Sequence, residues 1–135
     1  MRCGRAFRLP GPVGLRLVAR FPESVPAGQR TLSGAVEVTA RKAIRGVAPA
    51  AGDVFLVRDD QVVTTPVARD AIGMRWELAA GETRTVPAMA SLMSCEPEGG
   101  PLPPGDYELY ARFVVTPDDE AAQPAFGGPW RLRVR

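Results

Sequence analysis

Glycine and proline are spread along this chain at a density that excludes long helices. The 135 residues include 14 glycines and 14 prolines, well above the roughly 12% that the two contribute to average proteins. An interior proline costs a helix about 3 kcal/mol and an interior glycine about 1 kcal/mol. Because 45% of the residues are still hydrophobic, the chain can form one core, and its length suits a single domain. This composition favours short strands joined by tight turns.

Apolar and polar residues alternate along several short segments, which is the pattern of half-buried strands. In the clearest one, residues 107–115, Tyr107, Leu109 and Phe113 share one face. Alternation or compact apolar runs predict further strands at residues 14–20, 32–40, 53–59, 61–64, 73–78, 83–92 and 130–134. This count and spacing are typical of an antiparallel β-sandwich. We therefore expect an all-β protein of seven or eight strands, with one domain at residues 14–135 behind an irregular lead-in at residues 1–13.

The remaining segments are predicted to be loops. The longest are residues 43–53, 94–106 and 116–129, each rich in glycine, proline or charged residues. Loops held by a rigid scaffold carry a large share of binding sites. We therefore expect any binding surface to involve these three segments.

The composition argues against catalysis. The chain has no histidine, which removes the commonest general base near neutral pH and a common metal ligand. Its two cysteines cannot supply the four Cys and His ligands of a structural zinc site. No spacing of carboxylates nominates a catalytic pair, so we expect neither an enzyme nor a bound cofactor or metal.

Charge and hydropathy bear on the partners. The net charge is +2, and arginines are distributed from Arg2 to Arg135 rather than gathered on one stretch. Nucleic-acid binding needs such a gathering, so no nucleic-acid partner is expected. No apolar run approaches the roughly 20 residues of a membrane helix, and no direct membrane insertion is expected. Residues 1–13 lack the apolar centre of a signal peptide.

The stretch LPPGDYELYA resembles the turn into the penultimate strand of immunoglobulin-like and fibronectin-like sandwiches. In those domains a "tyrosine corner" hydroxyl bonds back to the loop backbone. On this resemblance Tyr107 is the corner residue, and Leu102 and Gly105 are its turn partners.

A wider set of features resembles secreted or lipid-anchored immunoglobulin-like domains of high-GC Gram-positive bacteria. They are the early Cys3, VPAGQRTLSGAVEVT, LAAGET, Cys95 before LPPGDYELYA, and the final GGPWRLRV. The turn ARKAIRG departs from the Asn-rich turn usual in that group. The resemblance implies an immunoglobulin-like fold and an extracellular or cell-surface setting, and it implies no defined activity.

The two cysteines, Cys3 and Cys95, both fall in predicted loops. A reactive thiol or a soft-metal site with Met89 and Met93 are alternatives. Redox pairs normally use Cys-x-x-Cys spacing, which this pair lacks. A disulfide is therefore the expected structure, and disulfides persist outside the cytosol.

Aromatic and acidic residues offer further candidates. Trp76 and Trp130 lie on the apolar faces of their strands, which favours burial in the core. Phe126 falls in the predicted loop PAFGGP and is the candidate for an exposed contact. The acidic residues at 118–120 and 59–60 match no calcium-loop spacing, so solvated turns are expected there.

These observations favour a non-catalytic extracellular or cell-surface module that binds a protein partner or itself. Self-association through a sheet edge is one route, because the Gly/Pro-rich residues 1–13 would be free to lie along a neighbour's edge strand. The alternative is an inhibitor-like module that presents a stiff loop, such as residues 94–106, to an enzyme.

Overall fold

The described part of the chain consists of strands and loops. The computed structural model describes residues 1–11, 13–69 and 72–135, and no helix occurs among them. The all-β prediction is confirmed. These three ranges contain ten strands, where seven or eight were expected: β1 (Leu15–Arg20), β2 (Ser24–Val25), β3 (Thr31–Ala40), β4 (Ile44–Pro49), β5 (Asp53–Arg58), β6 (Gln61–Val62), β7 (Gly73–Leu78), β8 (Thr83–Ser91), β9 (Gly105–Pro117) and β10 (Gln123–Val134).

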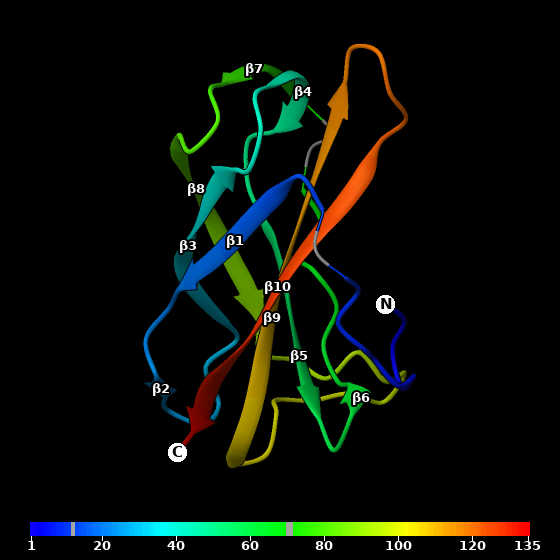
Figure 1. The fold of residues 1–135 in the computed structure, drawn as a ribbon. Helices are drawn as coiled ribbons and strands as arrows, with labels where there is room; N and C mark the ends of the chain where they lie inside the picture. Colours follow the sequence, from blue (N-terminus) through cyan, green and yellow to red (C-terminus); the bar gives the residue numbers. More distant parts are fainter. Residues whose placement is uncertain (12, 70–71) are drawn as a thin grey trace.

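The strands form two sheets (Figure 1). The first has the order β1-β3-β8, and the second has the order β2-β10-β9-β4-β7, with β5 paired to β9 and β6. Thus β9 has two neighbours on one side, β5 along residues 108–112 and β4 at residues 116–117. The long central strand β9 therefore organises the whole second sheet.

One core lies between the sheets. Alternate residues point inward, as Val36 and Val38 do on β3 and Leu109 and Phe113 do on β9, and all four are essentially inaccessible to solvent. Burying side chains of this size contributes about 1.5–3 kcal/mol each. Two sheets packed around a shared apolar core have the layered arrangement of a β-sandwich.

The prediction of a loop at residues 43–53 is wrong, because β4 lies there. This strand pairs with β7 from Ile44 to Pro49 and touches the end of β9. Gly46 permits that approach, since a Cβ atom at this position would collide with the carbonyl oxygen of Thr116. Tertiary pairing therefore overrides the weak strand propensity of a segment that contains glycine and proline.

The prediction of a loop at residues 116–129 is also wrong over most of its length. Strand β9 continues to Pro117 and β10 begins at Gln123, so only a five-residue turn separates them. The two glycines and Pro129 of β10 fall at an irregularity in the ladder, between Gly127 and Trp130, whereas Pro124 pairs in register with Val114. A bulge of this kind accommodates residues that regular strands exclude. Residues 94–104 do lie outside the strands.

The expected bond of Tyr107 is present. Its hydroxyl donates to the carbonyl oxygen of Pro103 at 2.6 Å and accepts from Nη1 of Arg58 at 3.1 Å. Leu102 is buried beside it, and Gly105, with a φ of 151°, begins the strand. The contacts of Tyr107 fasten the loop of residues 94–104 to the start of β9.

Candidate interaction surfaces

A disulfide joins Cys3 to Cys95, with the two Cα atoms 5.9 Å apart. Both sulfur atoms are thereby engaged, so neither acts as a thiol or as a thiolate ligand beside Met89 and Met93. The described residues contain no group of three or more His, Cys, Asp or Glu side chains arranged to hold a metal ion. The bond connects the start of the chain to the loop before β9.

The lead-in is irregular, but it is not free. Its backbone pairs with β6 and the preceding turn: Gly4 N–H donates to the Val62 carbonyl, Val62 N–H to the Arg5 carbonyl, and Phe7 N–H to the Asp60 carbonyl, all within 3.0 Å. The prediction that residues 1–13 remain available to a neighbour is therefore wrong for residues 3–7. These residues continue the second sheet beyond β6.

An aromatic recess lies beneath the lead-in, on the face of the second sheet that points away from the main core. We define this aromatic recess as Phe55 on β5, Tyr110 on β9 and Phe126 on β10. The ring of Phe7 occupies it, with centroid distances of 4.9 Å to Phe55, 4.7 Å to Tyr110 and 5.6 Å to Phe126. Together with Val57, Val62 and Met1 these residues form a second hydrophobic cluster, separate from the main core.

Phe126 is therefore not the freely exposed contact that its predicted loop position indicated. It is half-buried because β10 extends through this segment and because Phe7 packs against its ring. Its neighbour across the ladder is Arg112, whose Nε is buried and has no hydrogen-bond partner among the described residues. The recess was not anticipated from the sequence, since Phe7 and Tyr110 were not among the candidate residues.

The surroundings of Tyr110 in the aromatic recess change the pKa of its phenol. Burial raises the pKa of its phenol above the usual range, and the nearby Glu108 carboxylate, which accepts a hydrogen bond at 3.4 Å, raises the pKa further. The folded chain therefore holds this proton more tightly than the unfolded chain does.

This pKa shift predicts a loss of stability in alkali. The contribution of Tyr110 is complete below the ordinary tyrosine pKa of about 10 and declines as the pH rises past it, because the unfolded chain then releases the proton first. Urea unfolding at several pH values should show this decline. Tyr110→Phe keeps the ring and removes the proton, so its stability should fall less steeply over the same range. Parallel curves for the two proteins would contradict the assignment.

The two tryptophans differ in their surroundings. Trp76 on β7 is fully buried in the main core, as predicted, and its ring lies 5.0 Å from that of Phe113. Trp130 on β10 packs against the same core but is only half-buried. A core tryptophan and a partly exposed one are thus both present, and only Trp130 is available for an outside contact.

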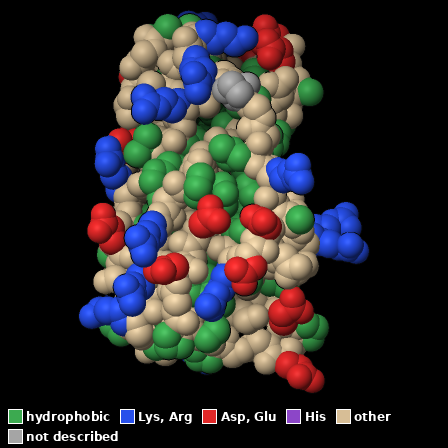
Figure 2. All heavy atoms as spheres, turned by 60° about the horizontal axis from the view of Figure 1, so that its bottom comes forward, with side chains coloured by type: hydrophobic (Ala, Val, Ile, Leu, Met, Phe, Trp, Pro, Cys, Tyr) green, Lys and Arg blue, Asp and Glu red, His purple; other side chains and the backbone are tan. Residues whose placement is uncertain are grey.

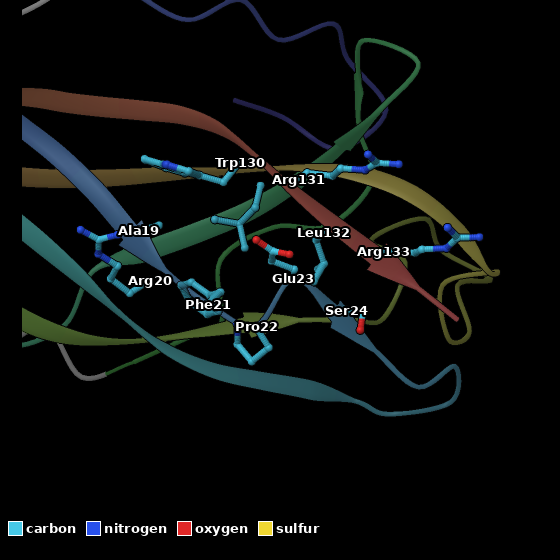
Figure 3. A pocket seen from close by; sticks show the side chains of 11 residues that line it. Ala19, Arg20, Phe21, Pro22, Glu23, Ser24, Trp130, Arg131, Leu132 and Arg133 are labelled. Carbon is cyan, nitrogen blue, oxygen red and sulfur yellow. The ribbon is translucent and has the colours of Figure 1, made fainter.

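Two grooves meet at Trp130. One, of about 690 Å³, separates residues 130–133 of β10 from residues 19–24, where the chain passes from β1 to β2. Figure 3 shows Trp130 and Arg133 on one side of this groove and Phe21 and Pro22 on the other. The other, of about 740 Å³, is lined by residues 57–59, 105–108 and 129–131. We refer to the two together as the Trp130 grooves.

Charges of both signs are mixed on the surface of the protein. Figure 2 shows Arg and Lys side chains interspersed with Asp and Glu side chains around a central area of hydrophobic side chains. Two arginines that line the Trp130 grooves are in ion pairs, Arg131 with Asp106 at 3.4 Å and Arg20 with Glu37 at 3.2 Å. The grooves are thus bordered by charges of both signs at short spacing.

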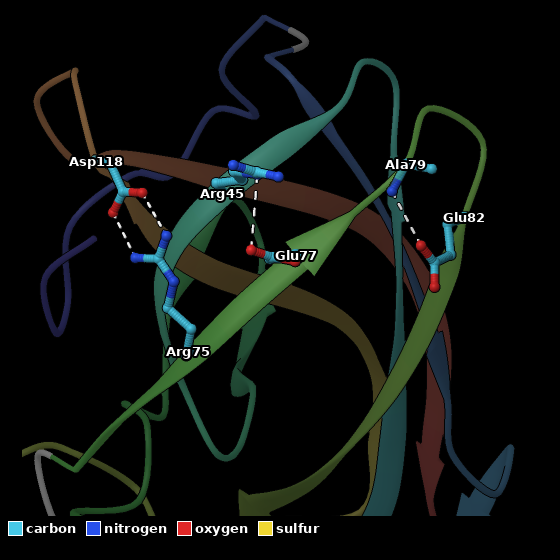
Figure 4. Close-up of polar contacts among 6 residues, drawn as sticks. All are labelled: Arg45, Arg75, Glu77, Ala79, Glu82 and Asp118. Carbon is cyan, nitrogen blue, oxygen red and sulfur yellow. Dashed lines mark hydrogen bonds and ion pairs between the residues drawn. The ribbon is translucent and has the colours of Figure 1, made fainter.

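The acidic turn between β9 and β10 is held by the guanidinium group of Arg75. Arg75 on β7 donates two parallel hydrogen bonds to Asp118, at 2.6 and 2.5 Å, beside the Arg45–Glu77 ion pair (Figure 4). The hydrogen bonds from Arg75 hold the pKa of Asp118 below its usual range. Asp118 thus joins the β9–β10 turn to β7.

Comparisons with known proteins give no family. No family model matches the chain, and no curated protein matches it. Among solved structures it is similar to a β-glucosidase from Listeria innocua in complex with laminaribiose, with 16% identity and a TM-score of 0.47 over 90% of this chain and 16% of that one. A β-glucosidase from Erythrobacter marinus matches at 16% identity and a TM-score of 0.42, over 93% and 15%. The chain thus spans less than a fifth of these enzymes.

None of the described segments forms a helix long and apolar enough to cross a membrane.

Proposed function

We propose that this chain is a non-catalytic, immunoglobulin-like interaction module of an extracellular or cell-surface protein. The fold assignment is supported by the chain path. After β1, the first strand of one sheet, the chain bends at residues 21–23 and continues as β2, which pairs in parallel with β10 in the other sheet. The Tyr107 hydroxyl bond at the start of β9 is a second immunoglobulin-like feature. Both agree with the resemblance to secreted or lipid-anchored domains of high-GC Gram-positive bacteria.

The observation that carries the interaction role is the half-buried Trp130 between two grooves. Tryptophan, tyrosine and arginine are the residues that dominate the binding energy of protein interfaces. Arg131 and Arg133 follow this tryptophan on β10, and both are exposed and line the first groove. A protein partner would bury the indole and place its own side chains in the two grooves.

The edge of β10 adds main-chain groups to this surface. On the side away from β9, only Arg133 and Val134 have ladder partners among the described residues, and these lie on β2. The first groove leaves a gap between residues 130–133 of β10 and residues 19–24, and an extended segment of a partner would enter the sheet edge there. The same edge supports self-association as one form of this function.

The setting outside the cytosol is supported by the Cys3–Cys95 disulfide. Cytosolic thiols are kept reduced, whereas disulfides persist in oxidising compartments. The described cysteines are both paired.

A binding experiment with a surface variant tests this function. Immobilised protein is exposed to culture medium of its source organism and to itself, and each bound protein is purified and its affinity measured by calorimetry. Arg133→Glu changes an exposed residue of the groove without touching the core, and we expect it to weaken binding at least about tenfold. Met74→Ala, an exposed apolar truncation on β7, should leave the affinity unchanged.

Two results would overturn the proposal. A partner that binds Arg133→Glu as tightly as it binds the wild type does not use the Trp130 grooves. A wild-type protein that captures nothing, and that remains monomeric by sedimentation at high concentration, has no interaction role of this kind.

A second candidate function rests on the loop before β9. Ser94 N–H donates to the Gly100 carbonyl at 2.9 Å and Gly99 N–H to the Glu96 carbonyl at 2.8 Å, while the disulfide ties Cys95 to the lead-in. The tip, residues 96–101, is exposed. A loop already held in one shape loses little conformational entropy on binding, which is the requirement for an inhibitor-like module.

The same experiment separates the two candidates. The triple variant Glu96→Ser, Pro97→Gly and Glu98→Ser alters the loop tip and leaves Cys95 in place. Loss of binding in this variant, with full binding retained by Arg133→Glu, would assign the partner surface to the loop. The reverse pattern would assign it to the Trp130 grooves.

A further inference from the structure

The lead-in is bound to the rest of the protein as a peptide ligand is bound. Three backbone hydrogen bonds align residues 4–7 with β6 and its turn, and one side chain, Phe7, fills the aromatic recess. Main-chain pairing at a sheet edge together with a pocket for a side chain are the two components of peptide recognition by strand addition.

Residues 8–11, which follow this ligand-like segment, make few contacts. Arg8, Leu9, Pro10 and Gly11 are exposed, and none of them has a backbone hydrogen bond within the described ranges. Gly11 also has open space where a side chain would be. A stretch of this kind is a hinge about which an element can move to another copy of the chain.

The charges of the lead-in and of the surface that it covers are complementary. Arg2, Arg5 and Arg8 are exposed on the segment. The surface that the lead-in covers is bordered by the turn Asp59–Asp60. Glu96 also lies close to the lead-in, because a Cβ atom on Gly4 would be 3.0 Å from its Oε1. Opposite charges of this kind accelerate the association of a lead-in with the complementary surface of another molecule.

We propose that the aromatic recess is a docking site for the lead-in of a second copy of this chain. Two chains then exchange residues 1–9, and each Phe7 occupies the recess of the other chain. The inference deepens the interaction function proposed above, but it uses the aromatic recess and not the Trp130 grooves. In the closed form each Phe7 occupies the recess of its own chain. The contacts are the same in the closed and exchanged forms, so the protein concentration determines which form is populated.

Exchange takes place while the cysteines are reduced, and oxidation then locks it. A low-molecular-weight disulfide accepts two electrons from Cys3 of one chain and Cys95 of the other and leaves as two thiols, which carry the two protons away. A dimer forms two such bonds. For short flexible connections the closed form has an effective concentration on the order of millimolar, so exchange is favoured in concentrated, reduced protein.

Isotope labelling of the full-length protein distinguishes the two forms. Equal amounts of ¹⁵N-labelled and unlabelled chains are reduced, denatured, refolded together at high concentration, and oxidised with glutathione disulfide. After size-exclusion chromatography, the dimer fraction is digested with a protease, and the masses of its Cys3–Cys95 linked peptides are measured by mass spectrometry. Exchange predicts linked peptides with one labelled and one unlabelled half, in the statistical proportion, whereas refolding at low concentration should give only uniformly labelled or uniformly unlabelled pairs.

Variants of the lead-in test the exchange. Deletion of Leu9 and Pro10 shortens the connection and hinders the closed form alone, so it should raise the share of dimer and of mixed peptides. Phe7→Ala weakens the same contact in both forms, so it should leave that share unchanged while it speeds hydrogen exchange of the Gly4 and Phe7 amides. Leu9→Ala, an exposed residue of the same segment, should behave as the wild type. Uniform pairs at every concentration, or no rise in mixed peptides when Leu9 and Pro10 are deleted, would refute the proposal. Either result would leave the Arg133→Glu experiment unaffected.

Discussion

Replacing Cys3 and Cys95 together by serine is expected to lower the free energy of unfolding by about 4–5 kcal/mol, because the bond restricts an unfolded loop that spans most of the chain. The two residues are 92 positions apart. Domains of this size have a total stability of about 5–15 kcal/mol, so the variant should be near the limit of folding. Urea unfolding, monitored by tryptophan fluorescence, measures the difference.

The loss should also have a local signature. Without the disulfide, the lead-in is held by its pairing with β6 and by Phe7 alone, so the amides of Gly4 and Phe7 should exchange with solvent much faster. Glu98→Gln, at an exposed position in the same loop, keeps the disulfide and should match the wild type. A double cysteine variant as stable as the wild type, with protected amides at those positions, would show that the bond contributes nothing.

The strands with strict alternation were predictable because one face of each is buried. Residues 73–78 were predicted as a strand, and β7 has those bounds. The predicted turn at residues 59–60 is the two-residue connection of a hairpin, with both aspartates at positive φ. Such patterns depend only on residues that are close together in the sequence, so they can be recognised without knowledge of the fold.

The strands that were missed depend on distant partners. Strand β4 exists because Gly46 lets Thr116 approach and because β7 pairs along its other edge. Nothing in the local pattern of residues 44–49 contains that information, whereas their glycine and proline argue for a loop. The two-residue strand β2 was likewise missed and is defined by its pairing with β10.

The aromatic recess left one sequence signal that was not used. Residues 54–57 of β5 are apolar without alternation, and all four are buried. A continuous apolar strand is typical of a sheet covered on both faces, which indicates a second layer over β5. The identity of the covering residue, Phe7, was not accessible in this way, because its irregular segment has no periodicity and its partners lie far along the chain.

Trp76→Ala is expected to destabilise the protein by about 3–5 kcal/mol, the usual cost of removing a buried aromatic side chain. The indole is 1% exposed, its ring lies 5.0 Å from that of Phe113, and the guanidinium carbon of Arg84 lies 4.8 Å from its centroid. Truncation leaves a cavity between β7 and β9, because neighbouring strands relax only partly. Thermal and urea unfolding should show the loss.

Met74→Ala provides the matched control, because Met74 lies two residues away on the same face of β7 but is 48% exposed. Its truncation should change stability by no more than about 0.5 kcal/mol. Trp76→Phe, which keeps a ring against Phe113, should fall between the two. If Trp76→Ala and Met74→Ala were equally mild, β7 would not pack its indole into the core, and the pairing of β7 with β4 would have to be different. The contrast between two positions on one face therefore tests the register of this strand as well as the energy of one side chain.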